Sequence, residues 1–76
     1  MPDKLLDASG LQCPMPLLKT KLELNAMVAG QQLEVLATDP GSARDIPAYL
    51  AMSDHRLISQ SETEGRYRFV IECGQS

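Results

Sequence analysis

Two helical patterns in this 76-residue chain each stand between short strand patterns. A strand–helix–strand unit within one sheet makes a right-handed crossover, so both helices should cover the same face. Thr63-Glu64-Gly65 separates the last two strand patterns and is typical of a hairpin, which reverses the final strand. We therefore predict a single domain over residues 1–76. Its class is α/β (α+β): a two-layer sandwich of order β-α-β-α-β-β, with a mixed four-stranded sheet. The strands are expected at 4–8, 32–38, 55–62 and 66–73, and the helices at 14–28 and about 42–53.

The first predicted helix carries two apolar stripes at helical spacing. One consists of Leu17, Thr20, Leu24 and Met27 or Val28, and the other of Met15, Leu18, Leu22 and Ala26. One stripe is enough to cover a sheet. The second stripe packs against the other helix, or its beginning forms a docking patch for a partner protein, and the pattern leaves both readings open.

The start of the second predicted helix has two possible caps. Ser42 with Asp45 three residues later resembles a capping box, and this start places Pro47 where the helix loses a backbone hydrogen bond. A cap at Asp45 instead places Pro47 in the first turn, where proline is tolerated. The sequence does not separate these two starts.

Charge and composition exclude several classes of function. The formal net charge is −3, and only Tyr49, Tyr67 and Phe69 are aromatic, so no basic or base-stacking surface for high-affinity nucleic-acid binding is expected. No apolar run is long enough to cross a bilayer, and residues 1–4 do not resemble a signal peptide. We expect a cytoplasmic protein with reduced cysteines. Two cysteines and one histidine are too few for a four-ligand zinc site, and we expect neither metal nor cofactor.

Cys13-Pro14-Met15-Pro16 stands where the first strand gives way to the first helix. We expect Cys13 at the cap, with Pro14 and Pro16 at the first and third helical positions, where backbone N–H groups lack helical partners anyway. The positive end of the helix dipole should then lower the pKa of the Cys13 thiol. No histidine or second cysteine adjoins Cys13, so dithiol exchange within the motif is excluded. A single, placed sulfur of this kind suits a carrier of sulfur.

Three segments resemble the TusA/SirA-like family of sulfur carriers: Asp7-x-x-Gly10-Leu11-x-Cys13-Pro14-x-Pro16, Ala37-Thr38-Asp39-Pro40 and Arg44-Asp45-Ile46-Pro47. The resemblance implies a central, antiparallel last strand. It also implies that Cys13 accepts sulfane sulfur as a persulfide from a cysteine desulfurase or rhodanese-like donor and passes it to a downstream relay protein. In some members the sulfur reaches 2-thiouridine of tRNA, and others serve different sulfur pathways. The sequence leaves the donor, the final acceptor and the oligomeric state open.

The remaining candidate residues could have structural or functional roles. Gly10, Pro14 and Pro16 should shape the cysteine loop, Gly10 through a positive φ or a close approach. Asp7 should hydrogen-bond to N–H groups of that loop. Met15 and Leu18 are candidate partner contacts. Lys19 and Arg44 are further candidates, each with solvated surface as the alternative.

His55 is expected to be a turn residue, and Cys73 a small residue of the core or strand end. The strand order places Cys73 at the edge of the sheet opposite Cys13, too far away for a disulfide.

Two other functions compete with the carrier. One is a stand-alone thiol-dependent reductase or transferase, which should turn over without any partner protein. The other is a non-catalytic regulatory or protein-binding module, which should not need Cys13.

Overall fold

The computed structural model describes residues 2–74. Its elements follow the predicted order and are β1 (Lys4–Ala8), α1 (Met15–Ala26), β2 (Gln32–Ala37), α2 (Pro40–Ala51), β3 (Arg56–Thr63) and β4 (Arg66–Glu72). The α+β class and the four-stranded sheet are confirmed. The boundaries differ from the predicted ones by up to two residues, at the end of α1 and at both ends of α2.

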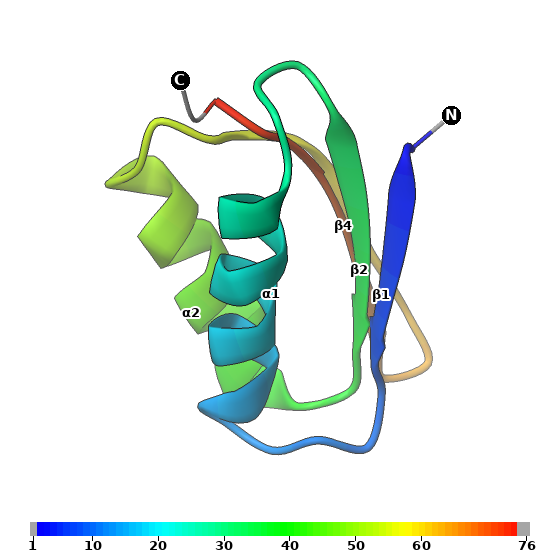
Figure 1. The fold of residues 1–76 in the computed structure, drawn as a ribbon. Coiled ribbons are helices and arrows are strands. Elements are labelled where there is room, and N and C mark those ends of the chain that lie inside the picture. Colours follow the sequence, from blue (N-terminus) through cyan, green and yellow to red (C-terminus); the bar gives the residue numbers. More distant parts are fainter. Residues whose placement is uncertain (1, 75–76) are drawn as a thin grey trace.

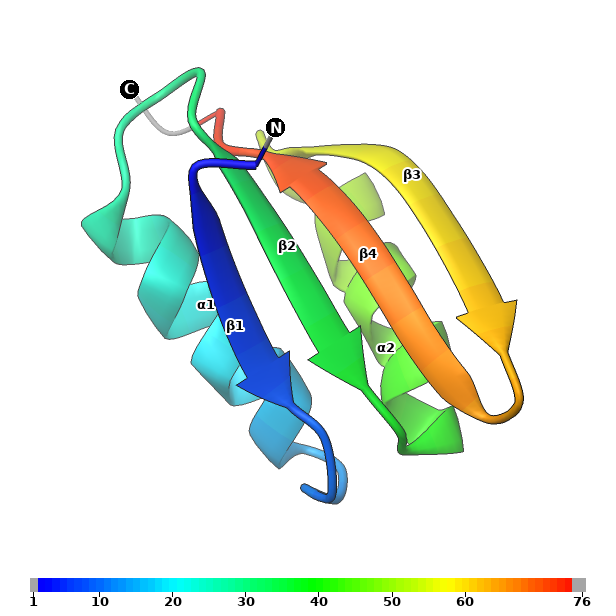
Figure 2. The same ribbon diagram turned by 90° about the vertical axis from the view of Figure 1, so that its right-hand side faces the viewer.

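The sheet is mixed, and its last strand is central. The strand order is β1-β2-β4-β3 (Figure 2). β1 pairs with β2 in parallel, whereas β4 runs antiparallel to both β2 and β3. Both helices lie on one face of this sheet, side by side (Figure 1). The crossover argument and the central last strand that the family resemblance implied are both confirmed.

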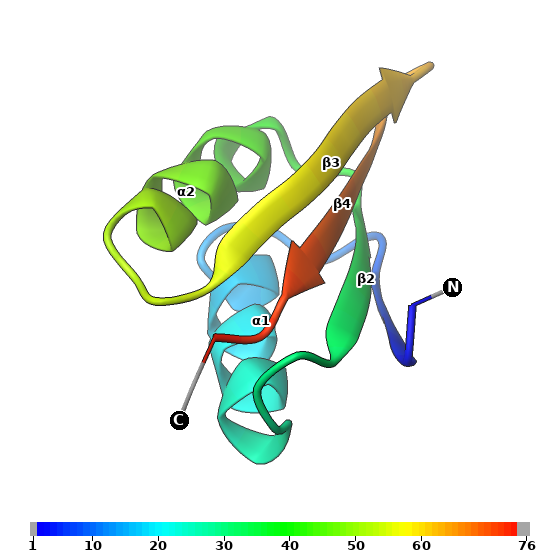
Figure 3. The same ribbon diagram turned by 90° about the horizontal axis from the view of Figure 1, so that it is seen from above.

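The core lies between the sheet and the two helices (Figure 3). Side chains at alternate positions of β2 and β4 face the helices, because successive strand residues point to opposite faces. The largest of them are Leu33, Val35, Phe69 and Ile71, and they pack with Leu24 of α1 and with Ile46 and Leu50 of α2. The opposite face of the sheet is open, and there Arg68 forms an ion pair with Glu34 across β4 and β2. On the helix-covered side, Lys4 of β1 forms an ion pair with Glu23 of α1 at 2.8 Å, at the edge strand of the sheet.

Only one of the two stripes of α1 is buried. Thr20, Leu24 and Met27 face the sheet, and the Thr20 hydroxyl donates to the backbone oxygen of Pro16 at 2.8 Å. The second stripe of Met15, Leu18, Leu22 and Ala26 is exposed along its whole length. The reading that this stripe packs against α2 is therefore wrong.

The helix α2 begins at Pro40, earlier than either predicted cap. Asp39 is the cap, and its side chain accepts a hydrogen bond from the Ser42 backbone N–H at 2.9 Å. Pro40 then takes the first helical position, which suits proline. Ser42 is buried inside the helix rather than capping it, and Asp45 lies in the second turn. Pro47 is inside the helix, where the burial of Ile46 and Leu50 outweighs the missing hydrogen bond.

Candidate functional site

The beginning of the loop that follows β1 is held by one local hydrogen bond and by one to the end of β2. Asp7 accepts a hydrogen bond from the Ser9 backbone N–H at 3.0 Å, as predicted. Hydrogen bonding from Ser9, through its side chain first and its backbone second, lowers the pKa of Asp7. Gly10 has a φ of +82°, which glycine adopts without strain, and its N–H donates to the Thr38 hydroxyl at 2.9 Å. The loop is therefore tied to the end of β2.

The motif cysteine lies just before α1, one position earlier than predicted. The Met15 N–H donates to the Gln12 backbone oxygen at 2.8 Å, which closes a turn over residues 12–15. Pro14 therefore takes the cap position, and Pro16 is the second helical residue instead of the third. The prediction that Cys13 caps the helix is wrong, because the tight turn extends the loop through Pro14. The Cys13–Pro14 peptide bond is cis.

The Cys13 sulfur contacts a residue from the second helix. Its Sγ donates a hydrogen bond to Oδ2 of Asp45 at 3.1 Å. The parallel strands β1 and β2 end at the same edge of the sheet, so the helices that follow them both begin there (Figures 1 and 2). Gly41 permits this approach: a Cβ added to it would lie 3.4 Å from Cys13 Cβ and 3.0 Å from Asp39 Oδ2. The site is thus the junction of two helix starts.

The surroundings of Cys13 raise the pKa of its thiol. The largest cause is the hydrogen bond to Asp45, followed by desolvation and by the negative charges of Asp45 and Asp39. The positive charge of Arg44 acts in the opposite direction and is the smallest of these effects. The sequence predicted a lowered pKa for Cys13, mainly from the helix N-terminus, and that prediction is wrong. A carboxylate in direct contact with the sulfur outweighs partial charges at the helix end.

The predicted contact residues are all at the surface. Met15 and Leu18 are each 43% exposed, and Lys19 is exposed on the same helix. Arg44 is exposed on α2 and acts electrostatically on Cys13. The structure therefore brings Arg44 to the sulfur, together with Asp39, Gly41 and Asp45, which sequence reasoning did not assign to the site.

The other titratable candidates lie at the opposite edge of the sheet. His55 precedes β3, and its Nδ1 accepts a hydrogen bond from the Gly74 N–H at 3.0 Å. Cys73 is 1% exposed and belongs to the hydrophobic core. Both match their predicted structural roles, and neither takes part in the Cys13 site.

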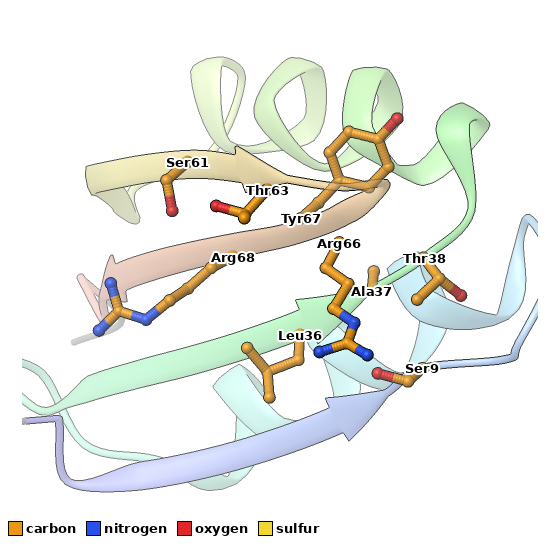
Figure 4. Close-up of a pocket in the computed structure, with 9 residues that line it drawn as sticks. All are labelled: Ser9, Leu36, Ala37, Thr38, Ser61, Thr63, Arg66, Tyr67 and Arg68. Carbon is orange, nitrogen blue, oxygen red and sulfur yellow. The ribbon is translucent and has the colours of Figure 1, made fainter.

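A hollow of about 490 Å³ occupies the open face of the sheet. Leu36 lies within it, Arg66 extends over the sheet toward Leu36 and Ser9, and hydroxyl side chains surround it (Figure 4). Ser9 and Thr38 line it and also belong to the segments that hold the cysteine loop. Cys13 itself is not among its lining residues, so the hollow and the sulfur are separate features.

No metal-binding cluster of three or more ligating side chains occurs within residues 2–74. Cys13 and Cys73 are both free thiols. The chemistry that this site offers is therefore the chemistry of one exposed sulfur with a carboxylate partner.

Comparison with known proteins places the chain in a family. The sequence profile described as Sulfurtransferase TusA matches residues 4–73. The chain belongs to the TusA family. This membership confirms the resemblance inferred from the cysteine motif and from the segments around Asp39 and Asp45.

Relatives match this TusA-family chain over nearly all of its length. The sulfur carrier protein TusA of Allochromatium vinosum is 47% identical over 70 residues, which are 92% of each chain. The putative sulfur carrier protein YrkI of Bacillus subtilis is 43% identical over 72 residues, covering 95% of this chain and 96% of that protein. The crystal structure of a SirA-like protein from Desulfitobacterium hafniense has a TM-score of 0.82 at 23% identity. It covers 95% of this chain and 99% of that one. This structural likeness confirms the fold.

Proposed function

We propose that this chain is a sulfur carrier that holds sulfane sulfur as a persulfide on Cys13. The observation that carries the proposal is an exposed, free cysteine at the junction of two helix starts, in a chain of the TusA family. The relatives named as sulfur carriers support the same role. The donor is a cysteine desulfurase or a rhodanese-like protein, and the acceptor is a cysteine of a downstream relay protein.

The transfer step needs no oxidant. The Cys13 sulfur attacks the outer sulfur of the donor persulfide, so the new Sγ–S bond forms as the donor S–S bond breaks. The electron pair of the broken bond stays on the donor sulfur as a thiolate, and the proton lost by Cys13 balances it. In the second step the acceptor thiolate attacks the outer sulfur on Cys13, and Cys13 returns to the thiol form.

Partner proteins dock on the exposed side of α1 next to the sulfur. Met15 and Leu18 provide apolar surface there, and their neighbour Lys19 adds a positive charge. Arg44 provides a second positive charge from the start of α2. Gly10, Pro14 and Pro16 act indirectly, since they set the path of the loop that presents Cys13.

The carrier works in the cytoplasm, where thiols remain reduced and can accept sulfur. Within residues 2–74 neither helix has the length and apolar character needed to span a membrane. The final acceptor belongs to tRNA 2-thiolation or a related sulfur pathway, and the relay protein determines which.

Intact mass spectrometry tests the proposal directly. The chain is incubated with a cysteine desulfurase, free cysteine and pyridoxal phosphate, and should gain the mass of one sulfur atom. Peptide mapping should place that sulfur on Cys13. Cys13→Ser should take up none, whereas Cys73→Ser should load as the wild type does.

Other outcomes would support the competing functions. Uptake that survives Cys13→Ser contradicts the carrier proposal. Partner binding that is unaffected by Cys13→Ser, with no uptake by the wild type, indicates a regulatory module. Turnover of a small thiol substrate without a partner protein indicates a stand-alone enzyme.

A further inference from the structure

The Cys13 thiol has one hydrogen-bond partner within the described residues, and it is a carboxylate. Sγ lies 3.1 Å from Asp45 Oδ2, which is normal for a bond in which sulfur is the donor. A carboxylate is an acceptor only, so the proton of this bond belongs to the sulfur. The bond therefore exists only while Cys13 is a thiol, and it disappears when the sulfur becomes a thiolate.

The other charges that act on Cys13 come from the same helix. Asp39 adds a second negative charge without a hydrogen bond to the sulfur, and Arg44 adds a positive charge. The Asp39 carboxylate is engaged by the N–H and hydroxyl of Ser42 at 2.9 and 3.2 Å. Asp45 is thus the carboxylate that is in direct contact with the sulfur.

We propose that Asp45 restrains the Cys13 sulfur during sulfur transfer, by holding its proton while the carrier is unloaded and by slowing release of a bound sulfur atom. The inference rests on the proposed carrier function and adds to it a residue that controls the reacting sulfur. Asp45 touches the atom that forms and breaks the S–S bond, and it comes from the second turn of the other helix.

The restraint acts on both half-reactions. When Cys13 accepts sulfur, only its thiolate attacks, and the bond to Asp45 keeps the thiolate fraction low until a partner disturbs that bond. When Cys13 gives up its sulfur, Cys13 is the leaving group, and a thiolate facing a carboxylate leaves more slowly. Without a partner, the unloaded carrier therefore reacts slowly with reagents that attack thiols. The loaded carrier retains its sulfur until it meets an acceptor.

The first experiment measures alkylation of Cys13 by iodoacetamide over a series of pH values, in a Cys73→Ser background. Asp45→Asn should alkylate several-fold faster at neutral pH, with its midpoint moved to lower pH. Asp39→Asn is the matched variant, because asparagine caps a helix as well as aspartate and only the charge is lost. It should have a clearly smaller effect. Asp54→Asn, at the opposite edge of the sheet, should match the wild type.

The second experiment measures release of sulfur. Each variant is loaded with sodium polysulfide and treated with cyanide, which attacks the outer sulfur and leaves as thiocyanate while Cys13 departs as a thiolate. Asp45→Asn should release thiocyanate several-fold faster than the wild type, and Asp39→Asn should be intermediate. Circular dichroism confirms that each variant is folded.

The two experiments separate failure of this inference from failure of the carrier function. Equal alkylation by Asp45→Asn and the wild type, or equal effects of Asp45→Asn and Asp39→Asn, overturns the role of the contact. Alkylation requires no sulfur loading, so it gives this answer even if the wild type takes up no sulfur. Absence of loading would instead count against the proposed function.

Discussion

The two cysteines, Cys13 and Cys73, lie at opposite ends of the layer formed by the helices. Cys73 packs at the end of α1, with its sulfur 3.5 Å from the Leu24 oxygen and 3.8 Å from the Met27 oxygen. It is buried, and its backbone pairs with Gln31. Cys13 lies at the start of α1, exposed, with a single carboxylate on its sulfur. Burial keeps the Cys73 sulfur unreactive as long as the chain stays folded, whereas the surface hydrogen bond restrains the Cys13 sulfur in a way that a partner can reverse.

The largest expected difference between the two cysteines is in disulfide formation. α1 has 12 residues and separates them by roughly 18 Å at 1.5 Å per residue, whereas a disulfide needs Cα atoms within about 7 Å. Mild oxidation should therefore give dimers linked through Cys13 and no internal bridge. Mass spectrometry without reducing agent checks this, and Cys13→Ser should form no disulfide-linked dimer. A peptide linking Cys13 to Cys73 within one chain would contradict the strand order.

The next largest difference is in the rate of alkylation. Cys73 should react only when the chain unfolds or its edge opens, because its sulfur is enclosed by the core. For a global stability of about 4 kcal/mol, this corresponds to roughly 1,000-fold slower labelling than an exposed thiol of the same reactivity. Labelling Cys13→Ser and Cys73→Ser separately, with and without urea, measures the ratio. Similar rates without urea would show that the Cys73 edge opens readily.

A smaller effect is expected from Gly41→Ala at the Cys13 edge. The added Cβ would lie 3.0 Å from Asp39 Oδ2, so the cap of α2 has to shift. We expect a loss of about 0.5–1 kcal/mol, typical of a weakened cap, and slower sulfur uptake by Cys13. Urea unfolding and uptake assays measure the two effects. Ala48→Ser, on the exposed side of α2, is the control: it should lower stability by up to about 0.5 kcal/mol through the lower helix propensity of serine, and it should leave sulfur uptake unchanged.

The smallest expected effect is a dependence of stability on alkaline pH. The bond to Asp45 raises the pKa of Cys13 in the folded chain. Its stabilising contribution is therefore complete below the unfolded thiol's pKa of about 8.5 and is lost as the pH rises through the folded value. Between neutral and alkaline pH, the wild type should lose more stability than Cys13→Ala in urea unfolding under reducing conditions. Identical losses in both chains would show that the bond does not stabilise the fold.

Much of the fold follows from patterns within a few residues of each other. The stripe that contains Thr20 and Leu24 is one of the two that the helical spacing indicated, and it is the one that covers the sheet. The cap of α2 was missed although Asp39-Pro40 carries a recognisable signal, an acidic cap followed by proline at the first helical position. The capping-box pattern of Ser42 and Asp45 favours a start at Ser42, and Pro47 favours a still later start at Asp45. The burial of Ile46 compensates for the hydrogen bond that Pro47 cannot make.

Only part of the site could be predicted from the sequence. Cys13 and Gly10 lie within one short motif, which correctly predicted the positive φ of Gly10 and a cysteine next to the start of α1, but not the residue that caps the helix. The Asp45 contact joins residues 32 positions apart, and its effect on the thiol is opposite to that of the helix end. The crossover rule already implied that both helices begin at the same edge of the sheet. It could not give the side-chain distance that makes Asp45 the dominant neighbour.

Mutations on the two sides of α1 should differ in how much they lower the stability of the fold. Substitutions on the buried side, such as Leu24→Ala, remove core packing and typically cost about 2–5 kcal/mol. Substitutions of exposed residues such as Leu18 and Leu22 usually change stability by less than about 0.5 kcal/mol. The surface beside the sulfur can therefore diverge freely while the scaffold stays intact. One small domain of this kind can be adapted to new donors and acceptors through a few surface changes, without a new fold.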